Sequence, residues 1–194
     1  MQADRVKTMK QLLTLLLATL LTSGCGTMNP RDFSDSSQRL DLFDYFQGHT
    51  LAWGLFEDRF GKLRRQFRVD ISGTVDGDTL VLEEDFLYAD GERQQRTWTI
   101  TRNSDDTYTG RAADVVGEAH GETAGNALHW TYLMDLQIGD RQIRVAFDDW
   151  MFLQPDGVLL NRARVSKFGL EIGSVTLAFM KPVQAQPVAV AASR

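Results

Sequence analysis

The chain has 194 residues, of which 43% are hydrophobic and 24% are charged, a balance typical of one globular domain with short appendages. The net charge of −5 and the lack of a Lys/Arg-rich block argue against a nucleic-acid partner and against electrostatic adhesion to anionic lipid. The single cysteine excludes an intramolecular disulfide and a multi-cysteine metal site.

Residues 9–26 have the pattern of an export signal that ends in a cysteine. A lysine precedes the apolar stretch Leu12–Leu21, and small residues then lead into Cys25. A membrane span needs about 20 apolar residues, so this shorter stretch has the length of a signal-peptide core. The arrangement resembles a bacterial lipoprotein signal, although Thr22 stands where leucine is most common. The resemblance implies that residues 1–24 are removed and that Cys25 is lipidated; the alternative is a secretory signal with an unmodified cysteine.

The segment before the domain is predicted to attach it to a membrane. A lipidated cysteine anchors a domain through its acyl chains, so the membrane is a predicted partner. Gly26, and not aspartate, follows Cys25. By the sorting habit of Gram-negative lipoproteins, this resemblance implies the inner leaflet of the outer membrane, facing the periplasm. Residues 25–38 are polar and contain Pro30, which predicts a flexible tether, and residues 182–194 predict a disordered tail.

The domain itself, residues 39–181, is predicted to be a β-barrel preceded by a short helix. Residues 39–48 place apolar side chains at helical spacing and end at Gly48, which indicates the helix. Beyond it, segments rich in β-branched and aromatic residues recur often enough to give about nine or ten strands. Turn signals separate them at 59–62, 75–78, 89–92, 103–106, 121–126, 138–141 and 155–157. Short sequential hairpins favour an antiparallel up-and-down, lipocalin-like barrel over the alternative, a β-sandwich.

Six polar residues share a strand face with apolar neighbours and form the candidate site. They are Glu84, Arg96, Asp114, Asp149, Asn161 and Lys167. Because successive strand side chains point to opposite faces, an inward apolar face takes these groups inward. Buried charges pair or line a hydrated cavity, so the set is either a ligand-lined cavity, with Arg96 on an acidic head group, or a structural ion-pair network. Either interpretation makes the set less exposed than residues of opposite parity, namely Arg64, Arg68, Asp148 and Arg162.

Other chemical signatures are weak. The three histidines, His49, His120 and His129, lack the spacing of metal ligands, and no metal or cofactor is predicted. The glycines of "GEAHGETAGN" do not follow the P-loop pattern and are assigned to tight turns and close strand approach. No G-x-S-x-G motif occurs. Trp53 in "HTLAWGLFED" is predicted to be a core residue.

Four blocks in order carry a family resemblance. They are "FQGHTLAWGLFEDRFGK", "LEEDFLYADGERQQRTWTI", "GRAADVVGEAHGETAGNALHWTYLM" and "FDDWMFLQPDGVLLNRARVSKFG". The chain resembles an uncharacterised family of bacterial lipoproteins, domain of unknown function family 3833, over roughly residues 40 to 181. The resemblance implies a proteobacterial origin, lipoprotein export and a lipocalin-like fold, and it supplies no catalytic residues to carry over.

Three functions fit these observations. The first is a carrier or sensor that binds a lipid or another amphiphile inside the barrel. The second is an interaction or envelope-assembly module with a solid barrel. The third is an enzyme on a fatty acyl or isoprenoid substrate, with Glu84, Asp114 or Asp149 as general acid or base. A hollow interior separates the first and third from the second.

Overall fold

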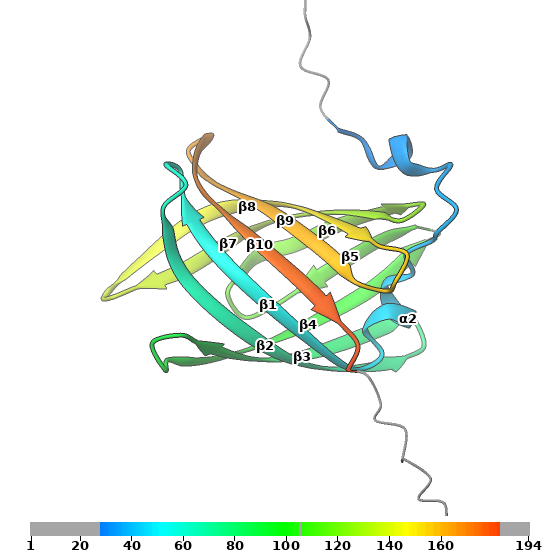
Figure 1. Ribbon diagram of the computed structural model, residues 1–194, viewed down its shortest axis with the longest axis horizontal. Coiled ribbons are helices and arrows are strands. Elements are labelled where there is room, and N and C mark those ends of the chain that lie inside the picture. Colours follow the sequence, from blue (N-terminus) through cyan, green and yellow to red (C-terminus); the bar gives the residue numbers. More distant parts are fainter. Residues whose placement is uncertain (1–27, 105, 183–194) are drawn as a thin grey trace, which may run out of the picture.

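Ten antiparallel strands close into a barrel in the computed structural model, each paired with its neighbours in the chain (Figure 1). Pairing of the first strand with the last, from Leu51 opposite Met180 to Asp58 opposite Gly173, completes the ring. The structure describes residues 28–104 and 106–182; the predicted targeting segment, Cys25 and residues 183–194 of the predicted tail lie outside them. The predicted up-and-down barrel is confirmed, and the sandwich alternative is wrong.

The elements follow one another with short connections. They are η1 (Pro30–Phe33), α2 (Leu42–Phe46), β1 (Gly48–Asp58), β2 (Leu63–Asp76), β3 (Thr79–Tyr88), β4 (Arg93–Ser104), β5 (Thr107–Arg111), β6 (Val115–Ala124), β7 (Ala127–Ile138), β8 (Arg141–Leu153), β9 (Leu159–Lys167) and β10 (Leu170–Met180). Their inner and outer faces alternate with a period of two. In β9, Leu159, Asn161, Ala163 and Val165 are buried, whereas Leu160, Arg162 and Arg164 between them are exposed.

Most turns lie where the turn residues predict them, with three differences. In the 121–126 segment, β6 continues to Ala124 and the chain reverses only at Gly125, which has a φ of +54°. The chain also reverses at 112–114 and at 168–169, where the sequence predicts no turn. Register shifts also occur, one of them between Val116 and His120 in β6. They locally change which side chains face inward.

The helix α2 closes one end of the barrel. Asp41 is its N-cap and accepts hydrogen bonds from the backbone N–H groups of Phe43 and Asp44. Its apolar side chains are buried, and Phe46 packs edge-on against Phe179 of β10 with ring centroids 5.5 Å apart. Arg102 of β4 donates two hydrogen bonds of 3.0 Å to Asp41, which holds the helix to the barrel wall. We call this end of the barrel the closed end.

Residues 28–38 pack on the barrel wall instead of forming the flexible tether that the sequence predicts. A reciprocal pair of hydrogen bonds between Asn29 and Asp32 caps η1. Phe33 packs edge-on against Phe152, with ring centroids 5.1 Å apart, and also contacts Trp150. Gly125 leaves room for this segment, since a Cβ there would collide with the carbonyl oxygen of Phe33.

Trp53 lies on the outer face of β1, with 46% of its surface exposed, so its predicted place in the core is wrong. The residues on either side, Ala52 and Gly54, point inward instead. A Cβ at position 54 would collide with the ring of Phe67, which accounts for the glycine there. Among residues 28–104 and 106–182, no helix has the length and apolarity needed to span a membrane.

Candidate functional site

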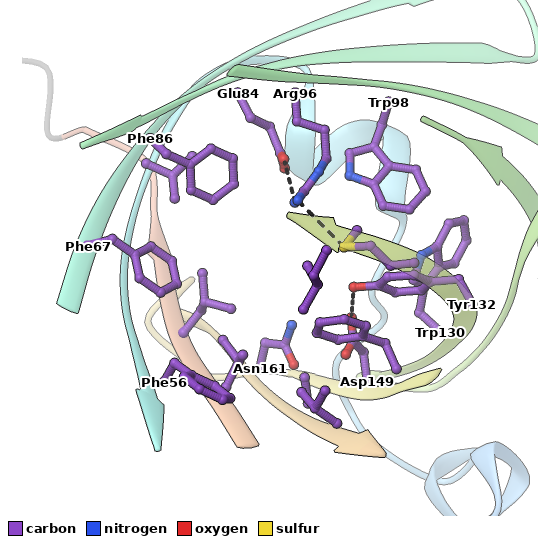
Figure 2. A pocket seen from close by; sticks show the side chains of 18 of the residues that line it. Phe56, Phe67, Glu84, Phe86, Arg96, Trp98, Trp130, Tyr132, Asp149 and Asn161 are labelled. Atoms are coloured by element: carbon purple, nitrogen blue, oxygen red, sulfur yellow. Dashed lines mark hydrogen bonds and ion pairs between the residues drawn. The ribbon is translucent and has the colours of Figure 1, made fainter. Parts of the chain in front are cut away.

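The barrel is hollow and encloses a cavity of about 450 Å³ (Figure 2). Its walls come from the inner faces of the strands, and most of the side chains are apolar or aromatic, among them Phe67, Phe86, Trp98 and Trp130. Leu42 and Phe46 of α2 form its floor at the closed end. An apolar space of this size matches that of small-molecule sites in proteins.

The opposite end of the barrel forms the mouth of the cavity, and we call it the open end. Five hairpin turns surround it, at 59–62, 89–92, 112–114, 139–140 and 168–169. Arg65, Tyr88, Gln94, Gln137 and Lys167 line the cavity close to these turns. Neither described helix covers this end, because α2 lies at the closed end and η1 packs against β6 and β7. A ligand can therefore enter between the turns.

One polar cluster lies midway along the wall and is centred on Arg96. The Nε and Nη2 of Arg96 donate to both carboxylate oxygens of Asp114 at 2.9 to 3.2 Å, and its Nη1 lies 3.8 Å from Glu84 Oε2. Burial alone lowers the pKa of Arg96, but Glu84 and Asp114 outweigh it and raise that pKa above its ordinary value. Burial raises the pKa of Glu84 to about 7 even though Arg96 opposes the shift.

A second polar cluster lies deeper, on β7, β8 and β9. Tyr132 donates its hydroxyl to Asp149 Oδ2 at 3.2 Å. Asn161 lies beside them on the neighbouring strand (Figure 2), and Asp149 and Asn161 are each only 4% exposed. Burial raises the pKa of Asp149 to about 7. Burial, together with the adjacent Asp149, also raises the pKa of the Tyr132 hydroxyl well above its ordinary value.

Three buried oxygens of these clusters have no hydrogen-bond partner among the residues that the structure describes: Glu84 Oε2, Asp149 Oδ1 and Asn161 Oδ1. All three residues line the cavity. Buried polar atoms in folded proteins are almost always paired, because leaving one unpaired costs on the order of 1 to 3 kcal/mol. A molecule in the cavity that carries O–H or N–H groups can supply the missing donors.

The structure brings five of the six predicted residues into these two clusters. Glu84, Arg96, Asp149 and Asn161 point inward from their strands, as parity predicts. Asp114 was assigned to a strand, but it lies in the β5–β6 turn and reaches Arg96 from there. Lys167 stands apart at the open end, where its Nζ lies 5.3 Å from the ring centroid of Phe168.

Residues of the opposite parity lie outside. The side chains of Arg64, Arg68 and Asp148 are 50%, 52% and 46% exposed, against 22% for Arg96 and 13% for Glu84. Asp148 binds His129 on the outer wall at 2.8 Å, so it takes no part in the cavity that its neighbour Asp149 lines. In the described part of the chain, no group of three His, Cys, Asp or Glu side chains is placed to hold a metal ion.

Sequence reasoning missed the role of Tyr132. It shares inward parity with Trp130 and Met134, and it is not among the six polar residues that strand parity selects. In the structure the ring stacks on Phe147, with centroids 4.9 Å apart, while its hydroxyl binds Asp149. A tyrosine on an apolar strand face thus indicates a buried polar contact, because a buried phenol O–H needs a hydrogen-bond partner.

The protein is a closed antiparallel β-barrel, and its apolar cavity is consistent with binding a small molecule. The sequence identifies the family: residues 19–181 match the family model described as protein of unknown function DUF3833, so the chain belongs to that family. No curated protein matches the chain.

Among solved structures, the barrel is similar to an S-type phycobiliprotein lyase, CPES, from Guillardia theta. The match has a TM-score of 0.51 and 9% sequence identity, and it covers 71% of this chain and 88% of the lyase. At this sequence identity, the structural match shows a shared fold alone.

Proposed function

We propose that the protein binds an amphiphile, with the apolar body along the barrel walls and the polar head at the two inner clusters, and that it carries this molecule as a lipid-anchored protein of the cell envelope. One observation carries the proposal: an apolar cavity of about 450 Å³ has unpaired oxygens of Glu84, Asp149 and Asn161 on its wall. The hollow interior argues against the solid interaction module. The similar barrel of a phycobiliprotein lyase supports a fold suited to holding a small molecule.

The inner clusters favour a head group that donates hydrogen bonds and carries no negative charge. Asp114 already occupies two donor nitrogens of Arg96, so the acidic head group first assigned to this arginine is not what the geometry favours. Above a pH of about 7, Glu84 and Asp149 are ionised, and two carboxylates then face the single Arg96, which Asp114 already pairs. A hydroxyl or amine head group matches both this charge and the unpaired acceptors.

Envelope location is the second half of the proposal. The cysteine that follows the apolar N-terminal stretch supports a lipid anchor at Cys25, and Gly26 after it favours the outer membrane with the domain in the periplasm. A carrier there would hold the apolar part of its cargo away from water.

Native mass spectrometry of the full chain from its own envelope, with extraction of bound lipid, tests cavity binding. Three amphiphiles of equal chain length, a fatty acid, a monoacylglycerol and an alkylamine, are then added separately. We expect the monoacylglycerol or the amine to bind at least about tenfold more tightly than the fatty acid, a difference of about 1.4 kcal/mol. An empty extract and no binding in the micromolar range, about −8 kcal/mol, would contradict the proposal.

A matched pair of variants on β9 shows where the amphiphile binds. Ala163 is buried and lines the cavity, whereas the preceding residue, Arg162, is exposed on the outer wall. Ala163→Leu adds volume inside and should weaken binding, whereas Arg162→Leu adds apolar surface outside and should not. Equal effects of the two substitutions would place the amphiphile outside the barrel.

The raised pKa values of Glu84 and Asp149 also favour a second candidate, an enzyme that uses one of these carboxyls as a general acid or base. The same mass spectrometry separates the two. A carrier returns its amphiphile with unchanged mass, and an enzyme converts it in a reaction that Glu84→Gln or Asp149→Asn abolishes.

A further inference from the structure

Two neighbouring hairpin tips at the open end carry exposed apolar side chains. Phe60, in the β1–β2 turn, is 82% exposed; Phe168 and Leu170, at the β9–β10 turn, are 94% and 68% exposed. The two turns project side by side from the barrel (Figure 1), and the backbone N–H of Arg59 donates to the carbonyl of Ile172 at 3.0 Å. Together they form one apolar projection at the edge of the cavity mouth, which we call the rim tip.

The rim tip differs from the rest of the open end. The other turns there contain the acidic residues Asp90, Glu92, Asp114 and Asp140. Isolated exposed apolar residues are ordinary on a protein surface, but large ones gathered on adjacent loops mark an interaction surface. Among the described side chains of the open end, the large apolar ones that are at least two thirds exposed lie on this side of the mouth.

Cationic groups accompany both aromatic rings. The guanidinium of Arg59 lies 5.0 Å from the ring centroid of Phe60, and Lys167 Nζ lies 5.3 Å from that of Phe168. Arg59, Lys62 and Lys167 form no ion pair within residues 28–104 and 106–182. The rim tip therefore carries local positive charge although the whole chain is acidic.

The backbone conformation at Phe168 indicates that its side chain has a role other than stabilising the fold. Phe168 has a φ of +52° and Gly169 a φ of +77°, so both central residues of this tight turn are left-handed. Asparagine and glycine suit such positions, whereas a bulky aromatic residue is strained there. Because the Phe168 side chain is 94% exposed, its burial within this chain does not offset the strain.

We propose that the rim tip docks on the surface of an anionic phospholipid bilayer. Aromatic side chains settle at the headgroup level of a membrane, and adjacent lysines and arginines are attracted to anionic lipids. Lys167 also lines the cavity, so docking places the mouth next to the membrane surface. This inference concerns an outer surface and stands whether or not an amphiphile occupies the barrel.

A fluorescent probe that responds to an apolar environment tests the contact in the full chain. The probe is attached at Leu170→Cys, on the rim tip, and in a matched protein at Asp90→Cys, on another turn of the open end, both with Cys25→Ser. Vesicles contain phosphatidylcholine with about one third phosphatidylglycerol, and the reference vesicles contain phosphatidylcholine alone. The N-terminal apolar segment is present in every protein and cannot produce a difference between the two sites.

We expect the emission at position 170 to shift to the blue and rise about threefold or more with the anionic vesicles, with a smaller change at position 90 and with neutral vesicles. Phe60→Ser combined with Phe168→Asn should abolish the change, while the asparagine relieves the left-handed strain and preserves the turn. No change at position 170, an equal change at position 90, or a change that survives both substitutions would overturn the proposal. If emission at position 170 does not change, a protein surface fits the rim tip better than a bilayer does.

Discussion

Tyr132 and Asp149 face each other across adjacent strands and share a hydrogen bond of 3.2 Å deep in the cavity, while the other oxygen of Asp149 has no partner. Their backbones are nearly opposite, since Asp149 pairs with Trp130 and Phe147 with Tyr132. The pair therefore offers a fixed polar contact point inside an otherwise apolar barrel.

Stability should fall as the pH rises from about 4 to about 7. The folded-state pKa of Asp149 is about 7, above its unfolded value, so the folded protein binds more protons in this range. The contribution is fully present below the unfolded pKa and is lost as the pH passes the folded one; three pKa units correspond to roughly 4 kcal/mol as an upper bound. Urea unfolding at pH 5 and pH 8 measures it. Asp149→Asn should stabilise the protein at pH 8 relative to wild type and have little effect at pH 5, whereas parallel pH profiles would contradict this prediction.

Arg96→Ala should destabilise the protein by about 3 kcal/mol, because it leaves the partly buried Asp114 and Glu84 without their cation. A double-mutant cycle with Asp114→Ala isolates the pair. The control is Arg144→Ala, which removes an equally close pair with Asp135 on the outer surface and should cost far less. Similar losses of stability for the two arginine variants would show that burial adds nothing to the contribution of the Arg96 ion pair.

Asn161→Leu should leave stability unchanged or raise it, because it removes a buried oxygen that has no hydrogen-bond partner among the described residues and keeps the same branched shape. The same change should weaken binding of a head group that donates hydrogen bonds. Thermal unfolding beside a binding titration measures both. A large loss of stability would mean that the amide has a structural role in the barrel.

Gly121→Ala should destabilise the barrel by about 1 to 3 kcal/mol, because its Cβ would collide with the indole ring of Trp130. Gly110 approaches the same ring from β5, so these two glycines make room for one tryptophan. Trp130→Leu in the Gly121→Ala background should recover part of the loss. Additive losses in chemical unfolding would show that the ring is not what excludes a side chain at position 121.

Cys25→Ser should move the protein from the membrane fraction to the soluble fraction, provided that the N-terminal signal is of the lipoprotein type. The mass of the intact mature protein measures the acyl chains directly. A soluble wild-type protein with an unmodified cysteine would contradict the lipid anchor and leave the cavity proposal standing.

Parity along single strands was enough to find the inward groups Glu84, Arg96, Asp149 and Asn161, because a closed antiparallel barrel keeps alternate side chains on one face. Their pairing could not be predicted, since the partner of each residue depends on the register between strands. Trp53 shows a further limit. Its flanking residues, Ala52 and Gly54, are the ones on the inward face, whereas a count of apolar residues favours the tryptophan.

The seam between β1 and β10 gives this barrel a particular order of folding. Every other ladder joins strands that are consecutive in the chain, but β1 meets its second partner only when Met180 has been synthesised. Until then β1 and the latest strand present open edges, which are sites of wrong pairing, and closing so long a loop slows folding. A nascent chain therefore cannot close the barrel before β10 has been synthesised. Such a delay suits a protein that, as proposed, crosses a membrane before it folds.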